Sequence, residues 1–250
     1  MTVVDGSSAA DQPQEHLEMR RALTRMSREL YRQGLFTPSG GNLSVRLAGG
    51  AGILITPSGL FKGRLRAADM VRIGLDGQVV GAALPGRVPS IEAGVHATVY
   101  RARSDVAVVV HGHPPHATAV ATKGLTLDGV TVEGREFGGV PRVPFLPPGS
   151  AELAEAVAGA LTAHDAVLLE GHGVFAAGAS LRAAADLLME VEHACRVMLL
   201  MNNLGVRAQC VPRDCVPAPN PPAEVEPCRQ IASGTPPAAA AKHTQRPPQP

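Results

Sequence analysis

The chain has 250 residues, of which 45% are hydrophobic, and a formal net charge of +1 at pH 7. A charge this close to zero argues against nucleic acid and against an anionic membrane surface as partners, and an aromatic content of 3% leaves few side chains for base stacking. No apolar run approaches the roughly 18 residues that a membrane span needs, and the N-terminus carries no secretory signal, so we expect a cytoplasmic protein.

Composition divides the chain into three segments. Residues 1–13 are small and polar and are predicted to be a flexible N-terminus, whereas residues 14–204 carry the apolar patterns of a folded domain. Residues 205–250 are rich in Pro and Ala and cannot bury enough apolar surface to offset their chain entropy, so we expect a disordered tail. Three of the four cysteines lie in this tail with a spacing that fits no zinc motif, and no disulfide framework is expected.

The first half of the domain is predicted to hold one amphipathic helix followed by short strands. Apolar residues recur at intervals of four, three and four positions, which is the spacing of one helix face: Met19, Leu23, Met26 and Leu30. Gly34 is placed to end this helix. Strands are predicted over residues 43–47 and 52–56, and a hairpin that turns at Asp76-Gly77 is predicted over residues 71–81.

The second half alternates predicted helices with two buried strands. Continuous apolar runs over residues 106–111 and 166–170 predict strands that are covered on both faces. The other predicted elements are, in chain order, a helix from Ser90 to Arg103, a helix over 116–122, short strands within 125–149, a helix over 151–161 capped by Ser150, and a helix over 181–202 capped by Ser180. Strands and helices mix throughout without a repeat, so the sequence favours a layered α/β or α+β domain.

Three histidines follow the two buried strands. His111 and His113 end the first apolar run in Val-Val-Val-His-Gly-His, and His172 follows the second in Leu-Leu-Glu-Gly-His-Gly. Because strand side chains alternate with a period of two, a His-x-His pair at a strand end presents both imidazoles on one face. Two imidazoles from one strand end and a third from another supply the three protein ligands of a catalytic zinc site. The alternative, three structural histidines, stays open at this point.

Glu92 lies at the start of the helix predicted from Ser90. A glutamate in this position commonly stabilises a helix through its dipole, but beside a metal it becomes a proton carrier or a fourth ligand. His96, four residues further along the same helix face, and His116, three residues after His113, are further candidate ligands. The remaining histidines are expected at the surface or in the tail: His16, His164, His193 and His243.

Two small, hydroxyl-bearing turns adjoin the first strands. They are Ser39-Gly40-Gly41-Asn42 and Thr56-Pro57-Ser58-Gly59. Such turns expose main-chain N–H groups that hold anions, although most turns of this composition are only turns. With Ser90 at a helix start they predict a pocket for a phosphate or a carboxylate. No Walker motif and no Gly-x-Gly-x-x-Gly after a strand is present, so a nucleotide is not indicated.

Taken in order, these segments resemble the class II aldolase/adducin superfamily over nearly the whole folded unit. The matching stretches are Ser39 to Arg46, Ile55 to Gly59, Pro89 to Glu92, Val110 to His113 and Gly171 to Gly173. The resemblance implies a three-layer α/β (α+β) fold with a central, largely antiparallel sheet flanked by helices, and a cyclic homotetramer with active sites at subunit interfaces. It also implies zinc ligands at His111, His113 and His172, a catalytic acid/base at Glu92, and a substrate-phosphate pocket at Gly41, Asn42, Ser58, Gly59 and Ser90.

The chain departs from the family pattern in two places. The sugar-phosphate enzymes of the family often carry a second serine directly after the position of Ser90, where this chain has Ile91. Its sugar-phosphate aldolases also use a tyrosine from the connection after the His-x-His segment as a proton donor, and residues 124–145 contain none. The two tyrosines of the chain, Tyr31 and Tyr100, lie in predicted helices elsewhere.

The resemblance implies an enzyme, a metal-dependent carbon–carbon lyase. The first hypothesis is retro-aldol cleavage of a small ketose phosphate through a metal-stabilised enediolate, with Zn²⁺ or another divalent cation such as Mn²⁺ or Co²⁺. The second is decarboxylation of a hydroxylated aromatic or keto acid, which leaves an equivalent electron pair. The third, from another class, is a non-catalytic adducin-like interaction domain. The expected partner is a small molecule, a phosphorylated sugar or a hydroxy-acid.

Overall fold

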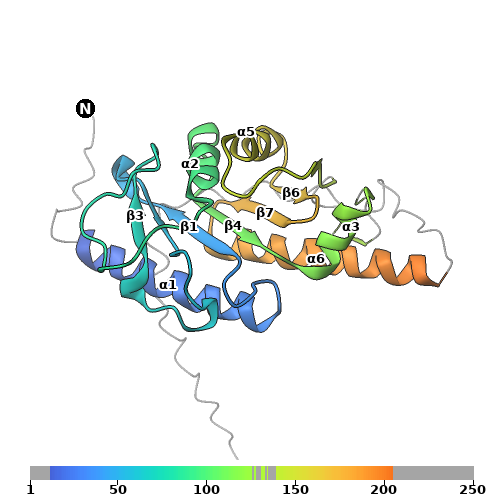
Figure 1. Cartoon of the computed structure of the whole chain (residues 1–250), viewed down its shortest axis with the longest axis horizontal. Coiled ribbons are helices and arrows are strands. Elements are labelled where there is room, and N and C mark those ends of the chain that lie inside the picture. The colour runs from blue at the N-terminus through green and yellow to red at the C-terminus, as the bar shows by residue number, and fades with distance from the viewer. Residues whose placement is uncertain (1–11, 126, 128–130, 133, 135–138, 205–250) are drawn as a thin grey trace, which may run out of the picture.

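The structure, a computed structural model, describes residues 12–125, 127, 131–132, 134 and 139–204 (Figure 1). The disordered tail predicted over 205–250 and most of the predicted N-terminal segment lie outside these residues. Residues 12 and 13 belong to the first helix, which begins two residues before the predicted start of the folded domain. Within the described ranges, no helix combines the length and the apolar character needed to cross a membrane.

A seven-stranded sheet forms the middle of the molecule. Its strand order is β3-β2-β1-β4-β7-β6-β5, and every neighbouring pair is antiparallel except β5 and β6. The predicted, largely antiparallel central sheet is therefore confirmed. The strands are β1 (Asn42–Arg46), β2 (Ile53–Ile55), β3 (Val71–Ile73), β4 (Val108–Gly112), β5 (Arg142–Val143), β6 (Ala166–Leu169) and β7 (Gly173–Gly178).

Helices cover both faces of the sheet, which confirms the three-layer arrangement. In Figure 1, α1 and α6 run along one face, and α2 and α5 lie on the other. The helices are α1 (Gln12–Arg32), α2 (Ala93–Ala102), α3 (Pro115–Thr122), α5 (Ala151–Ala160) and α6 (Leu181–Asn203), with short 3₁₀ turns at Ala48–Gly50, Lys62–Arg64 and Ala67–Asp69.

Alternating side chains along the strands build two separate cores. In β4, Val108 and Val110 pack into the cluster shared with α1 and α6, whereas Val109 packs into the cluster shared with α2 and α5. Because the strand period is two, His111 falls on the same face as Val109. There its ring stacks on Phe175 with centroids 4.3 Å apart. The first site histidine is thus placed on the face that α2 covers.

Several sequence-predicted helix ends are confirmed. Gly34 has a φ of +74°, a backbone conformation suited to glycine just after a helix. The hydroxyls of Ser150 and Ser180 accept hydrogen bonds at 3.1 Å from the main-chain N–H groups of Leu153 and Ala183, as N-caps do.

Three predictions of local structure need correction. Strand β7 was not expected, and the second arm of the predicted hairpin, residues 78–81, is not a strand, although Gly74 N–H donates to the Gln78 carbonyl and Val80 N–H to the Arg72 carbonyl across its turn. Helix α2 begins at Ala93 rather than at Ser90. Glu92, with φ −95° and ψ 11°, occupies the N-cap, and its N–H donates to the Ser90 hydroxyl at 3.3 Å.

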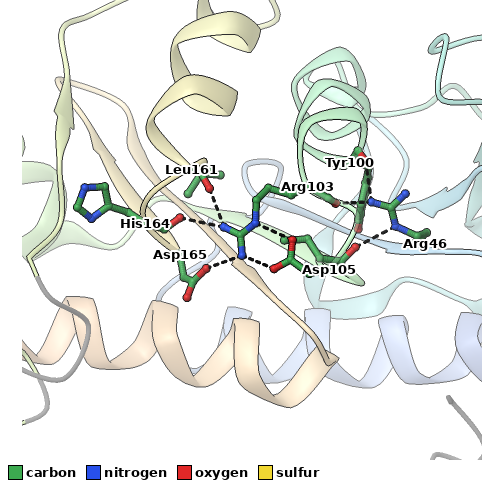
Figure 2. Close-up of polar contacts among 8 residues, drawn as sticks. Arg46, Tyr100, Arg103, Asp105, Leu161, His164 and Asp165 are labelled. Carbon is green, nitrogen blue, oxygen red and sulfur yellow. Dashed lines mark hydrogen bonds and ion pairs between the residues drawn. The ribbon is translucent and has the colours of Figure 1, made fainter. Parts of the chain in front are cut away.

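Arginines fasten the C-terminal end of α2 to the sheet and to α5 (Figure 2). Arg103 donates to Asp105 at 2.6 Å, to Asp165 at 3.0 Å and to main-chain carbonyls that follow α5. From β1, Arg46 donates to the Tyr100 carbonyl at 2.7 Å and lies 4.8 Å above the Tyr100 ring. Helix α2 is therefore held at this end, and its N-terminus points toward the opposite end of β1 and β4.

Candidate active site

The three sequence-predicted ligands come together at one edge of the sheet. His111 is near the end of β4, His113 follows that strand, and His172 lies in the turn between β6 and β7. The register pairs His111 with Phe175, which places the β6–β7 turn beside the end of β4. One nitrogen from each ring lies within 4.8 Å of the others, and the Nε2 atoms of His111 and His113 are 3.0 Å apart.

The donor set of this cluster fits a divalent cation. His111 Nδ1–H donates to the Val174 carbonyl at 3.0 Å, so its Nε2 carries the lone pair that faces the other rings. Burial, together with the neighbouring imidazoles, lowers the pKa of His111 well below its usual value, and burial and His172 lower the pKa of His113. Three imidazole nitrogens this close together match the three protein ligands of a catalytic metal site, in which each nitrogen offers its lone pair to the cation. The three residues could therefore hold a metal ion.

Glu92 reaches the same cluster from the N-terminus of α2. Its Oε2 is 3.1 Å from His111 Nε2, and its Oε1 is 3.4 Å from His172 Nε2. Asn42 Nδ2 donates to Oε2 at 2.8 Å. In the part of the chain that the structure describes, Oε1 has no hydrogen-bond partner, although the residue is only 3% exposed. One carboxylate oxygen is held in place while the other is left available.

A ladder of polar side chains joins α2 to β1. On the helix, Glu92, His96 and Tyr100 are four residues apart, and on the strand every second residue faces them. Four helical residues advance about 6.0 Å and two strand residues about 6.6 Å, so the two rows stay in step. The strand members of this α2–β1 ladder are Asn42, Ser44 and Arg46.

The hydrogen bonds from Ser44 onward are directed toward Glu92. Because Asn42 Nδ2 donates to Glu92, its Oδ1 accepts from His96 Nε2–H at 2.5 Å. His96 Nδ1 then accepts from the Ser44 hydroxyl at 2.7 Å. The Tyr100 hydroxyl lies 2.9 Å from Ser44 Oγ and donates to the Ser44 carbonyl at 3.0 Å. Burial lowers the pKa of His96 to about 3 and raises that of Tyr100, so one is a neutral imidazole and the other a protonated phenol.

Neither of the further candidate ligands lies in the metal cluster. Both ring nitrogens of His96 are engaged in the ladder, which leaves neither for a metal. His116 Nδ1 lies 2.6 Å from Glu192 Oε1, and Glu192 also accepts from main-chain N–H groups at the start of α3. The sequence showed both histidines but not their partners, which come from distant parts of the chain.

A cavity of about 280 Å³ opens beside the cluster. Four members of the predicted phosphate pocket line it, whereas Gly59 is exposed and is not among the lining residues. Asn42 lies in the wall, with its carboxamide engaged by Glu92 and His96. The cavity is lined by Ser39, Gly40, Gly41, Asn42, Ser58, Lys62, Ser90, Ile91, Glu92, His113, Pro148 and His172.

Two glycines make room for the ring of His113. A Cβ on Gly40 would lie 2.6 Å from His113 Nδ1, and a Cβ on Gly173 would lie 3.0 Å from its Cδ2 and 2.1 Å from the Gly112 carbonyl. Any side chain at either position would push the ring or the strand aside. These contacts explain the glycine at position 40 of the first turn and the glycine that follows His172. Lys62 and Pro148, by contrast, were missed, because nothing in the local pattern predicts that they line a cavity.

Comparison with known proteins identifies the family of the chain. Residues 21–199 match the family described as Class II Aldolase and Adducin N-terminal domain. The chain is 31% identical over 194 residues to 3-oxo-tetronate 4-phosphate decarboxylase of Pectobacterium atrosepticum, covering 75% of this chain and 87% of that protein. It is 36% identical over 183 residues to 5-methylthioribulose-1-phosphate/5-deoxyribulose-1-phosphate aldolase of Rhodospirillum rubrum, covering 72% and 80%.

Solved structures agree with these relatives. The crystal structure of L-fuculose-1-phosphate aldolase from Thermus thermophilus superimposes with a TM-score of 0.67 at 32% identity, covering 75% of this chain and 96% of that one. The chain therefore belongs to the class II aldolase and adducin family. Its relatives are named as aldolases and decarboxylases, and the prediction of an enzyme is confirmed. Class II aldolases depend on a metal, which the histidine cluster could hold.

Proposed function

We propose that the protein is a metal-dependent lyase that generates the enediolate of a small phosphorylated ketone and then protonates it. The observation that carries this proposal is the convergence of three imidazoles on a buried carboxylate whose Oε1 has no hydrogen-bond partner among the described residues. The first candidate reaction is retro-aldol cleavage of a ketose phosphate. The second, which one observation favours, is decarboxylation of a phosphorylated keto acid.

Each residue of the site has a distinct role in this proposal. His111, His113 and His172 would hold Zn²⁺, or Mn²⁺ or Co²⁺ in its place. The ion, when bound, supplies a Lewis acid that stabilises negative charge on the carbonyl oxygen of the substrate. Glu92 Oε1 delivers or removes the proton at carbon, while Asn42 keeps Oε2 in place. The serine and glycine turns hold the substrate by its anionic end.

Both candidate reactions lead to the same fragment. Cleavage of a 2-ketose 1-phosphate breaks the C3–C4 bond and leaves the electron pair on C3, next to the C2 carbonyl. Loss of CO₂ from 3-oxo-tetronate 4-phosphate breaks the C1–C2 bond and leaves the pair on C2, next to the C3 carbonyl. Each fragment is the enediolate of dihydroxyacetone phosphate, and one protonation at that carbon completes either reaction. One site therefore suits the aldolases and the decarboxylases among the relatives alike.

The placement of the tyrosines favours decarboxylation. Retro-aldol cleavage needs a group that exchanges a proton with the departing aldehyde, whereas CO₂ leaves without one. Tyr100 is buried in the α2–β1 ladder, and Tyr31 packs edge-on against Phe61 with centroids 4.8 Å apart. Neither lines the cavity. The described residues thus provide fewer proton carriers than an aldolase uses.

A substrate screen of the zinc-loaded protein tests the proposal. The panel consists of fuculose 1-phosphate, 5-deoxyribulose 1-phosphate and 3-oxo-tetronate 4-phosphate, with dihydroxyphthalate for the aromatic alternative. Dihydroxyacetone phosphate with an aldehyde identifies an aldolase, and dihydroxyacetone phosphate with CO₂ identifies the decarboxylase. Turnover of dihydroxyphthalate alone would contradict the proposal of a phosphorylated substrate.

The proposal extends to the oligomeric state and the cellular location of the protein. Ile91 lines the cavity and is 67% exposed. Phe145 is 58% exposed and lies against the β6–β7 turn at Gly171. Large apolar side chains at the mouth of a site are typical of a surface covered by another subunit. We propose a cytoplasmic homotetramer with its active sites at subunit interfaces, which sedimentation would detect as four times the 25.9 kDa chain.

A further inference from the structure

Lys62 is a buried lysine in the wall of the active-site cavity. It is 2% exposed and belongs to the 3₁₀ turn Lys62–Arg64. Its main-chain N–H donates to the Pro38 carbonyl at 2.9 Å, and its Nζ donates to the Pro57 carbonyl at 2.7 Å. Pro38 and Pro57 directly precede the serines of the two turns that line the cavity. Lys62 therefore ties the two anion-binding turns together.

The charge of Lys62 has no acidic partner among the described residues. An ammonium group has three donors, and the structure pairs one of them, with a neutral carbonyl. Burying a cation without a counter-charge is unfavourable by several kcal/mol. Burial accordingly lowers the pKa of Lys62 to about 8. A buried lysine without an acidic partner is stabilised when a bound ligand supplies the missing negative charge.

We infer that Lys62 supplies the positive charge that recognises the phosphoryl group of the substrate. The inference rests on the proposed function and adds the residue that makes the cavity specific for a phosphate ester. Ser58 and Ser90 line the same cavity, and Ser90 lies at the N-terminal end of α2, where the helix dipole also favours an anion. A phosphoryl group there would meet a full charge as well as hydroxyl and main-chain donors.

This assignment accounts for the apolar residue at position 91. Ile91 follows Ser90 in the cavity wall and offers no donor to an anion. Asn42 uses one of its two N–H donors on Glu92, and its Oδ1 accepts from His96. Lys62 adds a charged donor to the few neutral ones that remain, and a charged hydrogen bond is roughly twice as strong as a neutral one.

The first test measures binding of inorganic phosphate to the metal-loaded protein by calorimetry. The variants are Lys62→Met and Lys62→Gln, and the matched control is Lys123→Met, which makes the same charge change at an exposed position. We expect the dissociation constant to rise at least tenfold in both Lys62 variants and to stay unchanged in the control. Glutamine can still donate to the Pro57 carbonyl, so phosphate binding by Lys62→Gln at wild-type strength would overturn the inference. So would a wild-type protein that binds no phosphate.

Stability and kinetics complete the test. Removal of an unpaired buried charge should leave the thermal midpoint of Lys62→Met unchanged or higher; if that variant fails to fold, Lys62→Gln carries the comparison. With the substrate found in the screen, we expect KM to rise at least tenfold while kcat stays within a few-fold, and an equal change with its unphosphorylated analogue would overturn the assignment. If neither a ketose phosphate nor the phosphorylated keto acid reacts but phosphate binding still depends on Lys62, the proposed function fails and the anion site stands.

Discussion

The two carboxylate oxygens of Glu92 lie in different surroundings. Oε2 accepts from Asn42 at 2.8 Å, whereas Oε1 has no hydrogen-bond partner among the described residues and lies 3.4 Å from His172 Nε2. A proton carrier needs one contact that fixes its orientation and one lone pair left for the reacting carbon. In our proposal Oε2 meets the first condition and Oε1 meets the second.

Replacement of this carboxylate by its amide separates proton transfer from metal binding. Glu92→Gln keeps the length of the side chain and can still accept from Asn42, but it cannot carry a proton. We expect kcat to fall by about 10²–10⁴ while the metal content of the purified protein, measured by plasma mass spectrometry, stays at the wild-type level. Activity retained within tenfold would show that another group carries the proton.

The metal ligands are tested by the loss of one imidazole. His113→Ala removes a donor from a partly exposed position that two glycines already keep open, so we expect the metal and the activity to be lost while the circular dichroism spectrum is kept. His193→Ala, at an exposed position of α6, is the control and should change neither. Full metal content and activity in His113→Ala would remove this residue from the ligand set.

At the scale of elements, the α2–β1 ladder connects Glu92 to the C-terminal end of α2. Figure 2 shows the arginines that hold this helix end. Its links are set by two repeats, four residues on the helix and two on the strand, which advance nearly equally. A substitution at Tyr100 should therefore alter the orientation of Glu92 through Ser44, His96 and Asn42, and it should leave metal binding unchanged.

The ladder predicts a specific effect of Tyr100→Phe. The variant removes the hydroxyl that contacts both Ser44 Oγ and the Ser44 carbonyl, and this loss should loosen the orientation of Glu92. We expect kcat to fall about fivefold, equivalent to one hydrogen bond of about 1 kcal/mol, with KM and metal affinity unchanged. Tyr31→Phe in α1 is the matched control. An equal fall in kcat for both variants, or none for Tyr100→Phe, would contradict a positioning role.

A buried carboxylate in the 3₁₀ turn Ala67–Asp69 gives the fold a dependence on pH. Burial raises the pKa of Asp69, but hydrogen bonds from Arg66 and Arg87 outweigh burial and lower the pKa to about 2. A folded-state pKa below the unfolded value stabilises the protein above about pH 4, and this stability is lost as the pH falls toward 2.

Asp69→Asn tests this contribution. We expect the substitution to lower the free energy of unfolding by about 2 kcal/mol at neutral pH. The difference from the wild type should shrink as the pH falls from 4 toward 2, because the native carboxyl then also becomes neutral. Urea unfolding of both proteins across that range measures it, and a difference that stays constant with pH would show that ionisation of Asp69 does not matter.

At the scale of the molecule, the sequence revealed those parts that depend on local patterns. The apolar runs before His111 and His172 predicted β4 and β6, and serine caps marked the starts of α5 and α6. The three metal-ligand candidates followed from the period of a strand. These features need only neighbouring residues to be recognised.

The parts that could not be predicted depend on distant contacts. Strand β7 has glycine at both ends and contains Ala176 and Ala177, so its composition did not favour a strand. Residues 173–178 form a strand because they lie between β4 and β6 and pair with both. The burial of Lys62 and the pairing of His96 with Ser44 likewise depend on residues far away in the chain. The central, largely antiparallel sheet between helices was predicted from the resemblance to a family, because local patterns do not show how distant strands pair.

The central claim is that the site forms and protonates the enediolate of dihydroxyacetone phosphate. Solvent deuterium exchange into that compound, followed by proton NMR in D₂O, tests the claim without knowledge of which bond is broken. We predict exchange at the hydroxymethyl carbon with the metal-loaded protein, and none after metal removal or with Glu92→Gln. No exchange with the zinc, manganese or cobalt form, while the metal is shown to be bound, would contradict the account.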